Sequence, residues 1–420
     1  MTATLPAGFN LVEVTEDRYS EWLDCWLGTF GYPPGDDKEI VDFYRGTHPP
    51  ERAIAIEDDA GYVATNASLH RDLVLPGGNT VPLAACTGGS CHATLRRHGL
   101  MKATLHRLHE RAVEEGKAIA AGGSTEWPIY WRFGYGPGTY YNSLEVDARG
   151  VGWRSDAPGG DVEVRRVTGK EARDLAQSVY ARQAARTPGE VIPPPAYWDR
   201  LVMDPTSSRL EQLLAVGAGG GPRVCVAAED RGLVTYRVIG DWAPETTPRN
   251  TIHVIDFLAA DTEAAAALWR FLLSIDMVAT VQVWYAPVDN PLVWWVNDAR
   301  KLRARRHDGV WLRPLDVPTL LEARGWACDG ALTMRLHDPE GYADGTFRLE
   351  VDAGHGTCRR STAEPDMEMQ VAAVGSMLLG ATAATDLARG GRIQARDDRF
   401  PRLWDTMATP ERAPYISYYY

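Results

Sequence analysis

One strand–turn–helix stretch constrains the fold of this chain more than any other feature. Residues 83–91 form an apolar run that predicts a strand, and residues 100–115 have the pattern of an amphipathic helix. Between them lies a basic turn with Arg96, Arg97, His98 and Gly99. A helix start offers unpaired backbone N–H groups and the positive end of the helix dipole, so this turn favours an anion such as a pyrophosphate. A solvated helix cap can have the same sequence, and the turn alone does not distinguish the two.

The first third of the chain has the element order of a mixed α/β domain. Residues 17–30 predict a helix with one apolar face. Strands are expected at residues 53–57, 62–75 and 117–122, with a turn at residues 58–61 between the first two. Because these strands alternate with helices, we expect a sheet that is covered by helices.

A similar order returns after a Gly- and Asp-rich break at residues 147–161. The expected elements are a strand at 163–167, a helix at 170–186, strands at 224–228, 233–239 and 251–259, a helix at 261–275 and a strand at 279–285. This region looks like a second, degenerate copy of the first domain, but it lacks an Arg-x-x-Gly turn. Three consecutive prolines in residues 191–198 predict a loop or arm.

The third part of the chain begins near Arg313. It predicts a helix at residues 318–324, strands at 331–337 and 345–351, and a helix at 369–379. The breaks therefore divide the chain into three expected domains, residues 1–150, 151–310 and 311–420.

Composition narrows the classes of partner. The chain has 420 residues, 45% of them hydrophobic, which suits a protein of two or three domains. A formal net charge of −12 argues against nucleic acid as a partner, and it leaves room for a cationic substrate. No apolar run approaches the roughly 18 residues of a spanning helix, and residues 1–10 lack the pattern of a signal peptide. We therefore expect no membrane partner.

Cysteine usage indicates the compartment. Six cysteines without paired spacing are typical of the reducing cytoplasm. Cys86, Cys91 and His92 could suggest a metal site, but no second ligand cluster follows at a useful distance. Buried strand thiols are the simpler interpretation, and we expect no metal.

Three separated blocks carry a family resemblance. They are Thr94-Leu-Arg-Arg-His-Gly-Leu-Met101, Ile129-Tyr-Trp-Arg-Phe-Gly-Tyr-Gly-Pro137 and Trp311-Leu-Arg-Pro-Leu-Asp-Val-Pro318. The first domain resembles the GNAT superfamily of acyl-CoA N-acyltransferases, and the whole chain resembles the Eis (enhanced intracellular survival) family of bacterial acetyltransferases. The resemblance implies an α/β (α+β) architecture of tandem GNAT folds followed by a sterol-carrier-protein-like C-terminal domain. It also implies a homo-oligomer, a hexamer of two trimers, with one active site per chain.

The resemblance implies acetyl-CoA as the co-substrate, held between the strand and the basic turn. The residues that it assigns to acetyl-CoA binding are Gly89, Ser90, Cys91, Arg97, His98, Gly99, Leu100, Met101, Lys102, Thr125 and Glu126. For Ser90 and Cys91 the alternative is strand packing, and for Arg97 it is a solvated charge.

The resemblance also assigns the acid and the base. Tyr130 stands where the family places the proton donor to the leaving thiolate, and a phenol with a pKa of about 10 suits a thiolate with a pKa of about 8.5. We interpret Tyr135 as a packing residue. In this family the C-terminal carboxylate reaches the active site, and this chain ends Tyr415-Ile-Ser-Tyr-Tyr-Tyr420, unlike a polar, frayed tail. The carboxylate of Tyr420 is therefore the candidate base. The alternative is that these tyrosines only close the third domain.

Some residues depart from the family pattern. Gly88 and Gly89 stand where bulkier residues are usual, which should widen or reshape the acceptor pocket. Trp127 and Trp131 replace small residues, and His98 replaces an always-charged arginine.

Two functional classes remain. The first is an acetyl-CoA-dependent N-acetyltransferase that acts on a primary amine of a polycationic, aminoglycoside-like small molecule or of a lysine. The second is an Eis-like scaffold with altered or lost acyl transfer, which serves a pathway-specific step or binds a ligand in natural-product metabolism. Acetyl-CoA binding discriminates between them.

Overall fold

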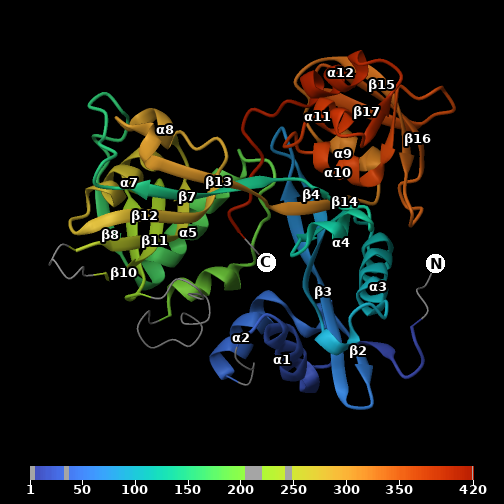
Figure 1. The fold of residues 1–420 in the computed structure, drawn as a ribbon, viewed down its shortest axis with the longest axis horizontal. Helices are drawn as coiled ribbons and strands as arrows, with labels where there is room; N and C mark the ends of the chain where they lie inside the picture. The colour runs from blue at the N-terminus through green and yellow to red at the C-terminus, as the bar shows by residue number, and fades with distance from the viewer. Residues whose placement is uncertain (1–4, 33–36, 204–219, 242–247, 419) are drawn as a thin grey trace. The chain divides into compact units, whose positions relative to one another are not determined.

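The computed structural model describes residues 5–32, 37–203, 220–241, 248–418 and 420. The chain forms two compact units that alternate along the sequence (Figure 1). Unit 1 comprises Met1–Thr139, Thr187–Pro193 and Asp308–Tyr420, and unit 2 comprises Tyr140–Arg186 and Pro194–His307.

The first sheet of unit 1 has seven strands in the order β1-β2-β3-β4-β5-β14-β6. The strands are β1 (Asn10–Glu13), β2 (Ala53–Asp58), β3 (Gly61–Val74), β4 (Thr80–Cys91), β5 (Ile119–Gly123), β6 (Gly136–Pro137) and β14 (Val310–Pro314). β4 runs parallel to β5, and β14 joins the sheet from far along the chain by pairing antiparallel with β5 and β6. The C-terminal part of the chain therefore completes the first sheet.

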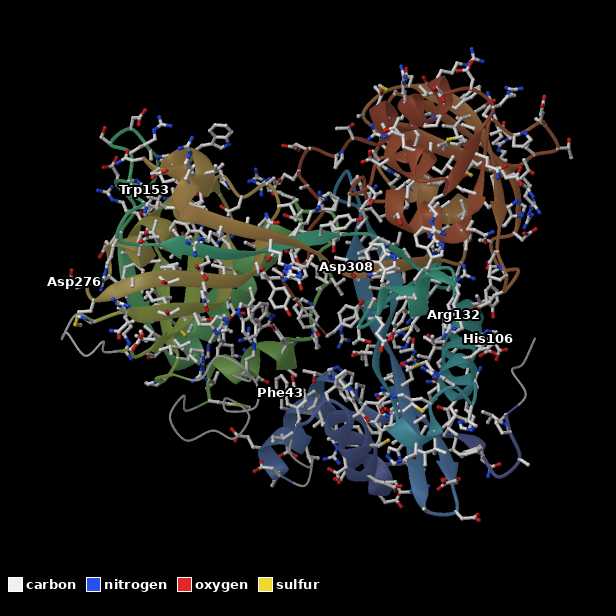
Figure 2. The ribbon with its side chains drawn as sticks, viewed as in Figure 1. Phe43, His106, Arg132, Trp153, Asp276 and Asp308 are labelled. Atoms are coloured by element: carbon white, nitrogen blue, oxygen red, sulfur yellow. The ribbon has the colours of Figure 1, made fainter. Side chains whose placement is uncertain are left out.

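Within the described residues, four α-helices accompany this sheet: α1 (Tyr19–Thr29), α2 (Lys38–Thr47), α3 (Leu100–Glu114) and α4 (Trp127–Trp131). Short 3-10 helices cover Glu16–Arg18, Pro50–Arg52 and Ala93–Leu95. The sequence did not predict α2, whose start is capped by Asp37 through bonds from the N–H groups of Glu39 (3.0 Å) and Ile40 (3.4 Å). α2 buries one face that includes Phe43 (Figure 2).

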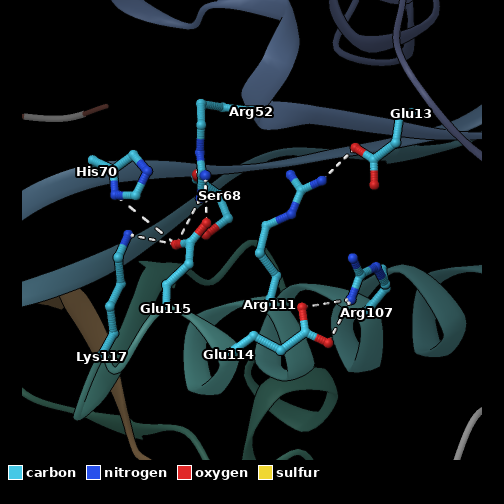
Figure 3. Close-up of polar contacts among 9 residues, drawn as sticks. All are labelled: Glu13, Arg52, Ser68, His70, Arg107, Arg111, Glu114, Glu115 and Lys117. Atoms are coloured by element: carbon cyan, nitrogen blue, oxygen red, sulfur yellow. Dashed lines mark hydrogen bonds and ion pairs between the residues drawn. The ribbon is translucent and has the colours of Figure 1, made fainter.

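α3 turns the predicted apolar stripe toward the sheet, with Leu100, Leu105, Leu108 and Ala112 buried. Charged contacts hold its C-terminal end (Figure 3). Glu115 accepts hydrogen bonds from Arg52 at 2.6 and 3.1 Å, and it lies 3.2 Å from the Lys117 ammonium. The position of the helix start, which matters for the site below, is thus fixed from its other end.

The second sheet of unit 1 has the order β17-β16-β15-β18-β19. Its strands are β15 (Gly330–His337), β16 (Gly345–Asp352), β17 (His355–Arg360), β18 (Met367–Gln370) and β19 (Ile393–Ala395), accompanied by α9 (Val317–Ala323), α10 (Val371–Met377), α11 (Ala384–Arg389) and α12 (Arg399–Ala408). α10 packs directly on β6 and β14, because Gly136 and Gly375 leave no side chain between the backbones.

Unit 2 is built on one seven-stranded sheet in the order β13-β7-β12-β11-β10-β9-β8. The strands are β7 (Tyr140–Asp147), β8 (Val164–Val167), β9 (Val224–Ala228), β10 (Gly232–Ile239), β11 (Asn250–Ala259), β12 (Val278–Pro287) and β13 (Leu302–Asp308). Its helices are α5 (Gly169–Ala184), α7 (Thr262–Ser274) and α8 (Leu292–Trp295), with 3-10 helices at Pro195–Leu201 and Ala299–Lys301. Leu268 and Trp269 of α7 fill the core of this unit.

Two local predictions are wrong. The helix expected at residues 369–379 begins only at Val371, because Met367–Gln370 is the strand β18, paired with β15 and β19. Sheet pairing overrides the local pattern there. The expected arm at residues 191–198 contains a bridge between Leu73 and Val191 and the start of a 3-10 helix at Pro195.

The described residues form neither a membrane-spanning helix nor a cluster of metal ligands. None of the helices in those ranges is long and apolar enough to cross a membrane. Nor do the described ranges contain a group of three or more His, Cys, Asp or Glu side chains that could hold a metal ion.

Candidate active site

The parallel ladder between β4 and β5 stops before β4 ends. The last pair is Cys86 with Gly122, whereas β4 continues to Cys91 and keeps its pairing with β3 through an irregular register near Thr65. The edge of β4 beyond Cys86 therefore has backbone groups that the ladder to β5 does not use. This gap between two parallel strands is the centre of the candidate site.

The basic turn lies between the end of β4 and the start of α3. Gly99 caps the helix in the left-handed conformation (φ +84°), and Arg97 is also left-handed (φ +69°). The side chains of Arg96, Arg97, His98 and Lys102 are exposed. No side chain caps α3, so helix geometry leaves its first N–H groups free for an anion.

The predicted turn residues are thus brought together at one helix end. Leu100 is buried and the Met101 thioether contacts Asn66, at 3.8 Å from its Nδ2 atom. These two residues can offer only backbone N–H groups, while Arg97 and Lys102 can offer charge. Such a donor set fits the pyrophosphate of a nucleotide-like co-substrate.

The predicted strand residues differ in what they can contribute. The Ser90 hydroxyl lies 2.6 Å from the Thr65 hydroxyl and 3.3 Å from the Cys25 carbonyl oxygen, so its side chain has the packing role. Gly89 has no side chain, and a Cβ atom there would lie 3.3 Å from Met101 Cε. Cys91 is half-buried and lines a pocket of about 490 Å³ with Cys25, His92 and Arg96. Gly89 and Ser90 can therefore bind a co-substrate only through their backbone.

Thr125 and Glu126 lie at the end of β5, just before α4, and both are exposed toward solvent. Sequence reasoning missed their neighbour Ser124. Its hydroxyl is buried and has no hydrogen-bond partner among the described residues. A buried hydroxyl without a partner is unfavourable in the isolated protein, and a bound molecule could satisfy it.

Three tyrosines lie near enough to the Cys86 thiol to interact with it electrostatically, namely Tyr130, Tyr135 and Tyr420. Burial and the proximity of Cys86 raise the pKa of Tyr130 to about 12. The pKa of the Tyr420 phenol is raised well above its ordinary value by burial and by the nearby Cys86 and Tyr418. The Tyr135 hydroxyl lies 3.6 Å from the Cys86 sulfur, to which it can donate, and the Cys86 thiol donates to the Ala84 carbonyl oxygen at 3.7 Å. The two predicted catalytic residues, Tyr130 and Tyr420, thus both interact electrostatically with the same thiol.

The C-terminal segment is held by contacts that sequence reasoning missed. Tyr415 donates its N–H to the Pro188 carbonyl oxygen (2.8 Å), and Ser417 donates twice to the buried carboxylate of Glu190. Tyr418 is buried and its ring lies 6.0 Å from that of Tyr420. Tyr419 lies outside the described residues.

Gly88 lies against aromatic side chains of α1. Gly88 has φ +66°, and a Cβ atom there would lie 3.0 Å from the Trp22 ring and 3.4 Å from Trp26. Trp22 and Trp26 of α1 thus fill the space that a larger residue at position 88 would take.

A polar atom lies in this aromatic cluster. The ring of Trp26 lies 5.3 Å from that of Tyr44 and 5.2 Å from that of His48. The His48 Nε2 atom is buried and has no partner among the described residues. Burial, aided by Arg71, lowers the pKa of His48 to about 3, so its imidazole is neutral.

Comparison with known proteins places this geometry in a family. The acetyltransferase (GNAT) domain matches residues 10–138 and again residues 189–315, and the sterol carrier protein domain matches residues 317–417. The N-acetyltransferase Eis of Mycobacterium tuberculosis is 32% identical over 397 residues, which cover 91% of this chain and 94% of that protein. The chain belongs to the Eis family of N-acetyltransferases.

Other Eis-like proteins agree with this assignment. An uncharacterized N-acetyltransferase of Streptomyces avermitilis is 31% identical over 90% of this chain and 91% of its own length. The crystal structure of Eis1 from Mycobacterium abscessus superposes with a TM-score of 0.82, covering 98% of this chain and all of that one at 24% identity. The predicted architecture of two GNAT domains and a sterol-carrier-protein-like domain is confirmed, and this Eis-family chain is an acetyltransferase. The GNAT fold implies acetyl-CoA as its co-substrate.

Proposed function

We propose that this protein transfers the acetyl group of acetyl-CoA to a primary amine of a polycationic, aminoglycoside-like small molecule or of a lysine. Tyr130 acts as the general acid and the C-terminal carboxylate of Tyr420 as the base. The observation that carries the proposal is that Tyr130 and Tyr420 both interact electrostatically with Cys86, the last residue of β4 that pairs with β5.

Acetyl-CoA would bind along that gap. Its pyrophosphate would take the N–H groups of Leu100, Met101 and Lys102 and the charge of Arg97, while Gly99 allows close backbone approach. Gly89, Ser90 and Cys91 would line the pantetheine arm through their backbone, with His98 at the turn and Thr125 and Glu126 on the opposite side. This arrangement would place the thioester near Cys86, where the strands separate.

The chemistry needs two proton transfers. The amine nitrogen attacks the thioester carbonyl carbon, a C–N bond forms and the C–S bond breaks. Tyr130 gives its phenol proton to the departing thiolate, and the carboxylate of Tyr420 takes a proton from the nitrogen. A buried phenol with a pKa of about 12 stays protonated at neutral pH and so has a proton to give, but the raised pKa makes it a weaker acid than a free phenol.

A cationic acceptor is supported by the net charge and by the aromatic cluster around His48. The chain has a formal net charge of −12, which attracts polycations at long range. The neutral His48 Nε2 atom can accept a hydrogen bond from an amine, and the Trp26 and Tyr44 rings around it present the π faces that cations favour.

Acetyl-CoA binding and thiol release test this proposal. Calorimetric titration with acetyl-CoA should show binding, and release of free thiol should rise when aminoglycosides, polyamines or lysine peptides are added. Acetylated product should appear in equal amount by mass spectrometry. Absence of acyl-CoA binding by the folded protein would overturn the assignment, and binding with no amine-dependent thiol release across the panel would overturn the acceptor class.

We also propose that residues 1–150 form the catalytic domain, 151–310 the degenerate copy and 311–420 the C-terminal domain. The family assignment supports a homohexamer, and six unpaired cysteines support a cytoplasmic location. Light scattering of the purified protein tests the hexamer, because a monomer or dimer has a clearly smaller mass.

A further inference from the structure

A series of buried, hydrogen-bonded polar side chains leads away from Cys86 and has no part in the mechanism above. The Tyr135 hydroxyl lies 2.7 Å from His109 Nε2, and His109 Nδ1 lies 2.7 Å from Glu340 Oε2. Tyr135 and His109 are fully buried, whereas the Glu340 side chain is 7% exposed. His106, also on α3 (Figure 2), lies 3.7 Å from the other Glu340 oxygen and is more exposed. This series of side chains thus runs from the gap between β4 and β5 toward solvent.

The proton positions in this series of side chains follow from the hydrogen-bond partners of His109. Burial raises the pKa of Glu340, but the hydrogen bond from His109 and the charge of Arg313 outweigh it, so the pKa is lowered and the group is a carboxylate. Burial lowers the pKa of His109 despite Glu340, so the imidazole is neutral. A carboxylate only accepts, so His109 Nδ1–H donates to Glu340. His109 Nε2 then accepts from the Tyr135 hydroxyl.

Glu340 is held in place by a buried ion pair. Arg313 of β14 lies 2.7 Å from Asp338, and both side chains are fully buried. Asp338 accepts from the N–H groups of Glu340 (3.0 Å) and Ala343 (2.8 Å), which fixes the loop after β15. Gly134 (φ +82°) lets the chain pass Arg313, since a Cβ atom there would be 2.7 Å from its Nε atom.

The inner end of this series of side chains, at Tyr135, lies close to the proposed catalytic groups. The Tyr135 oxygen is 3.6 Å from the Cys86 sulfur, and its ring lies 5.6 Å from the Tyr130 ring. The Tyr135 hydroxyl has one proton and two partners, His109 Nε2 at 2.7 Å and the Cys86 sulfur at 3.6 Å. When the proton is on the shorter bond to His109, the lone pairs of the Tyr135 oxygen can take a proton from the gap.

The reaction needs a route by which a proton can leave the site. An alkylamine with a pKa of about 10.4 is an ammonium ion at neutral pH, while the released thiol, with a pKa of about 8.5, keeps its proton. Each transfer of acetyl to an ammonium ion therefore releases one net proton, which has to leave a closed site.

We propose that Tyr135, His109 and Glu340 form an outward proton relay from the Cys86 end of the gap. Tyr135 takes a proton from the gap as its own proton moves to His109 Nε2 and the His109 Nδ1 proton moves to Glu340. Glu340 then releases the proton to solvent on the side of His106. The His109 proton is now on Nε2, so a flip of the imidazole ring and rotation of the Tyr135 hydroxyl restore the resting arrangement before the next turnover. The three are positioning residues, since none touches the reacting atoms, and the inference rests on the proposed amine acetylation.

Comparing transfer to two acetyl acceptors distinguishes a proton relay from a merely structural role of these residues. An amine and its hydrazide analogue differ in that the hydrazide nitrogen is already uncharged at neutral pH, so its acetylation releases no net proton. In single turnovers at pH 7, Tyr135→Phe and Glu340→Gln should slow transfer to the amine on the order of 10²-fold and leave transfer to the hydrazide within about threefold. Raising the pH should restore the rate with the amine. Glu114→Gln, an exposed change on the same helix, is the matched control.

The outcomes are distinct. Equal losses with both acceptors, or no loss with either, overturn the relay. Thermal unfolding and acetyl-CoA titration of each variant identify a folding defect, and Tyr135→Phe keeps the ring volume, so this variant remains informative if Glu340→Gln is destabilised. Turnover of both acceptors by the unchanged protein tests the proposed function separately.

Discussion

Glu190 accepts two hydrogen bonds from Ser417, one from its backbone N–H at 2.9 Å and one from its hydroxyl at 2.7 Å. Glu190 is fully buried, and its own carbonyl oxygen accepts from the N–H of Val74, at 2.9 Å, in β3. The C-terminal segment is therefore tied to the first sheet just before it ends. Any role of the C-terminus in catalysis depends on this attachment.

Glu190→Ala should release that segment. Loss of a buried acceptor of two hydrogen bonds should lower the free energy of unfolding by about 1–3 kcal/mol, and turnover should fall further than stability because the carboxylate of Tyr420 is no longer aimed. Urea unfolding and the acetyl-transfer rate measure the two effects. Ser417→Ala is the control, since it removes only the hydroxyl bond. A folded Glu190→Ala protein with parental turnover would contradict the link between this attachment and catalysis.

Arg97→Ala and Gly99→Val should weaken acetyl-CoA binding. Loss of a charge-assisted contact costs about 1.5–3 kcal/mol, which is roughly a 10- to 150-fold rise in Kd. Valine at position 99 would meet the left-handed backbone (φ +84°) and crowd the approach of the phosphate. Calorimetric titration with acetyl-CoA provides the measurement, with Arg107→Ala on the solvent side of α3 as control. Parental affinity in both folded variants would show that the turn is only a solvated cap.

Tyr130→Phe should keep acetyl-CoA affinity and lose turnover on the order of 10²-fold or more, since it removes the proton donor and preserves the ring. Because Tyr135→Phe alters a tyrosine of the same cluster, comparison of the two variants is informative. Only Tyr130→Phe should slow transfer to both the amine and the hydrazide. Unchanged single-turnover rates would return Tyr130 to a packing role.

Periodicity was sufficient for most of the sheet and helix positions. The strand expected at residues 224–228 is β9, and the helix expected at residues 100–115 is α3, because their apolar patterns match the faces they bury. The strand β18 was missed because it is defined by its neighbours β15 and β19, which are distant in sequence.

The site was predictable where a motif is local, as at the turn before α3. His109 and Glu340 are 231 residues apart, and no spacing rule connects them. Tyr135 was correctly expected to be buried, but its hydrogen bond to His109 has no signal in the sequence. Glu190 lies directly before the proline-rich segment that was predicted to be a loop, and nothing in the sequence connects it to Ser417, so their contact could come only from the fold.

His48 should make stability depend on pH in the acid range. Its pKa is lowered from about 6.5 in the unfolded chain to about 3 in the folded one, by burial and Arg71. Since the unfolded chain binds the proton more tightly, the contribution of neutral His48 is complete above pH 6.5 and is lost as the pH falls toward 3. Between these two pKa values the free energy of unfolding changes by up to about 1.4 kcal/mol per pH unit. His48→Asn, which can keep a bond to Thr47, should remove this component from urea unfolding curves measured between pH 4 and 7 (roughly the window of the shift). If the free energy of unfolding of His48→Asn depends on pH as steeply as that of the parent, His48 is not the source of this pH dependence.

The last prediction concerns the C-terminus itself. If the carboxylate of Tyr420 is the base, the chemistry depends on where the chain stops and not on the phenol. The Tyr420 hydroxyl is buried and has no hydrogen-bond partner among the described residues, so Tyr420→Phe should be silent in turnover and neutral or slightly stabilising. Extension by a few residues keeps the ring but turns the carboxylate into an amide, and it should abolish most of the activity. Acetyl-CoA titration and thermal unfolding show whether the extended protein is still folded and still binds its co-substrate. An extended protein that meets both conditions and turns over at the parental rate would exclude the terminal carboxylate as the base.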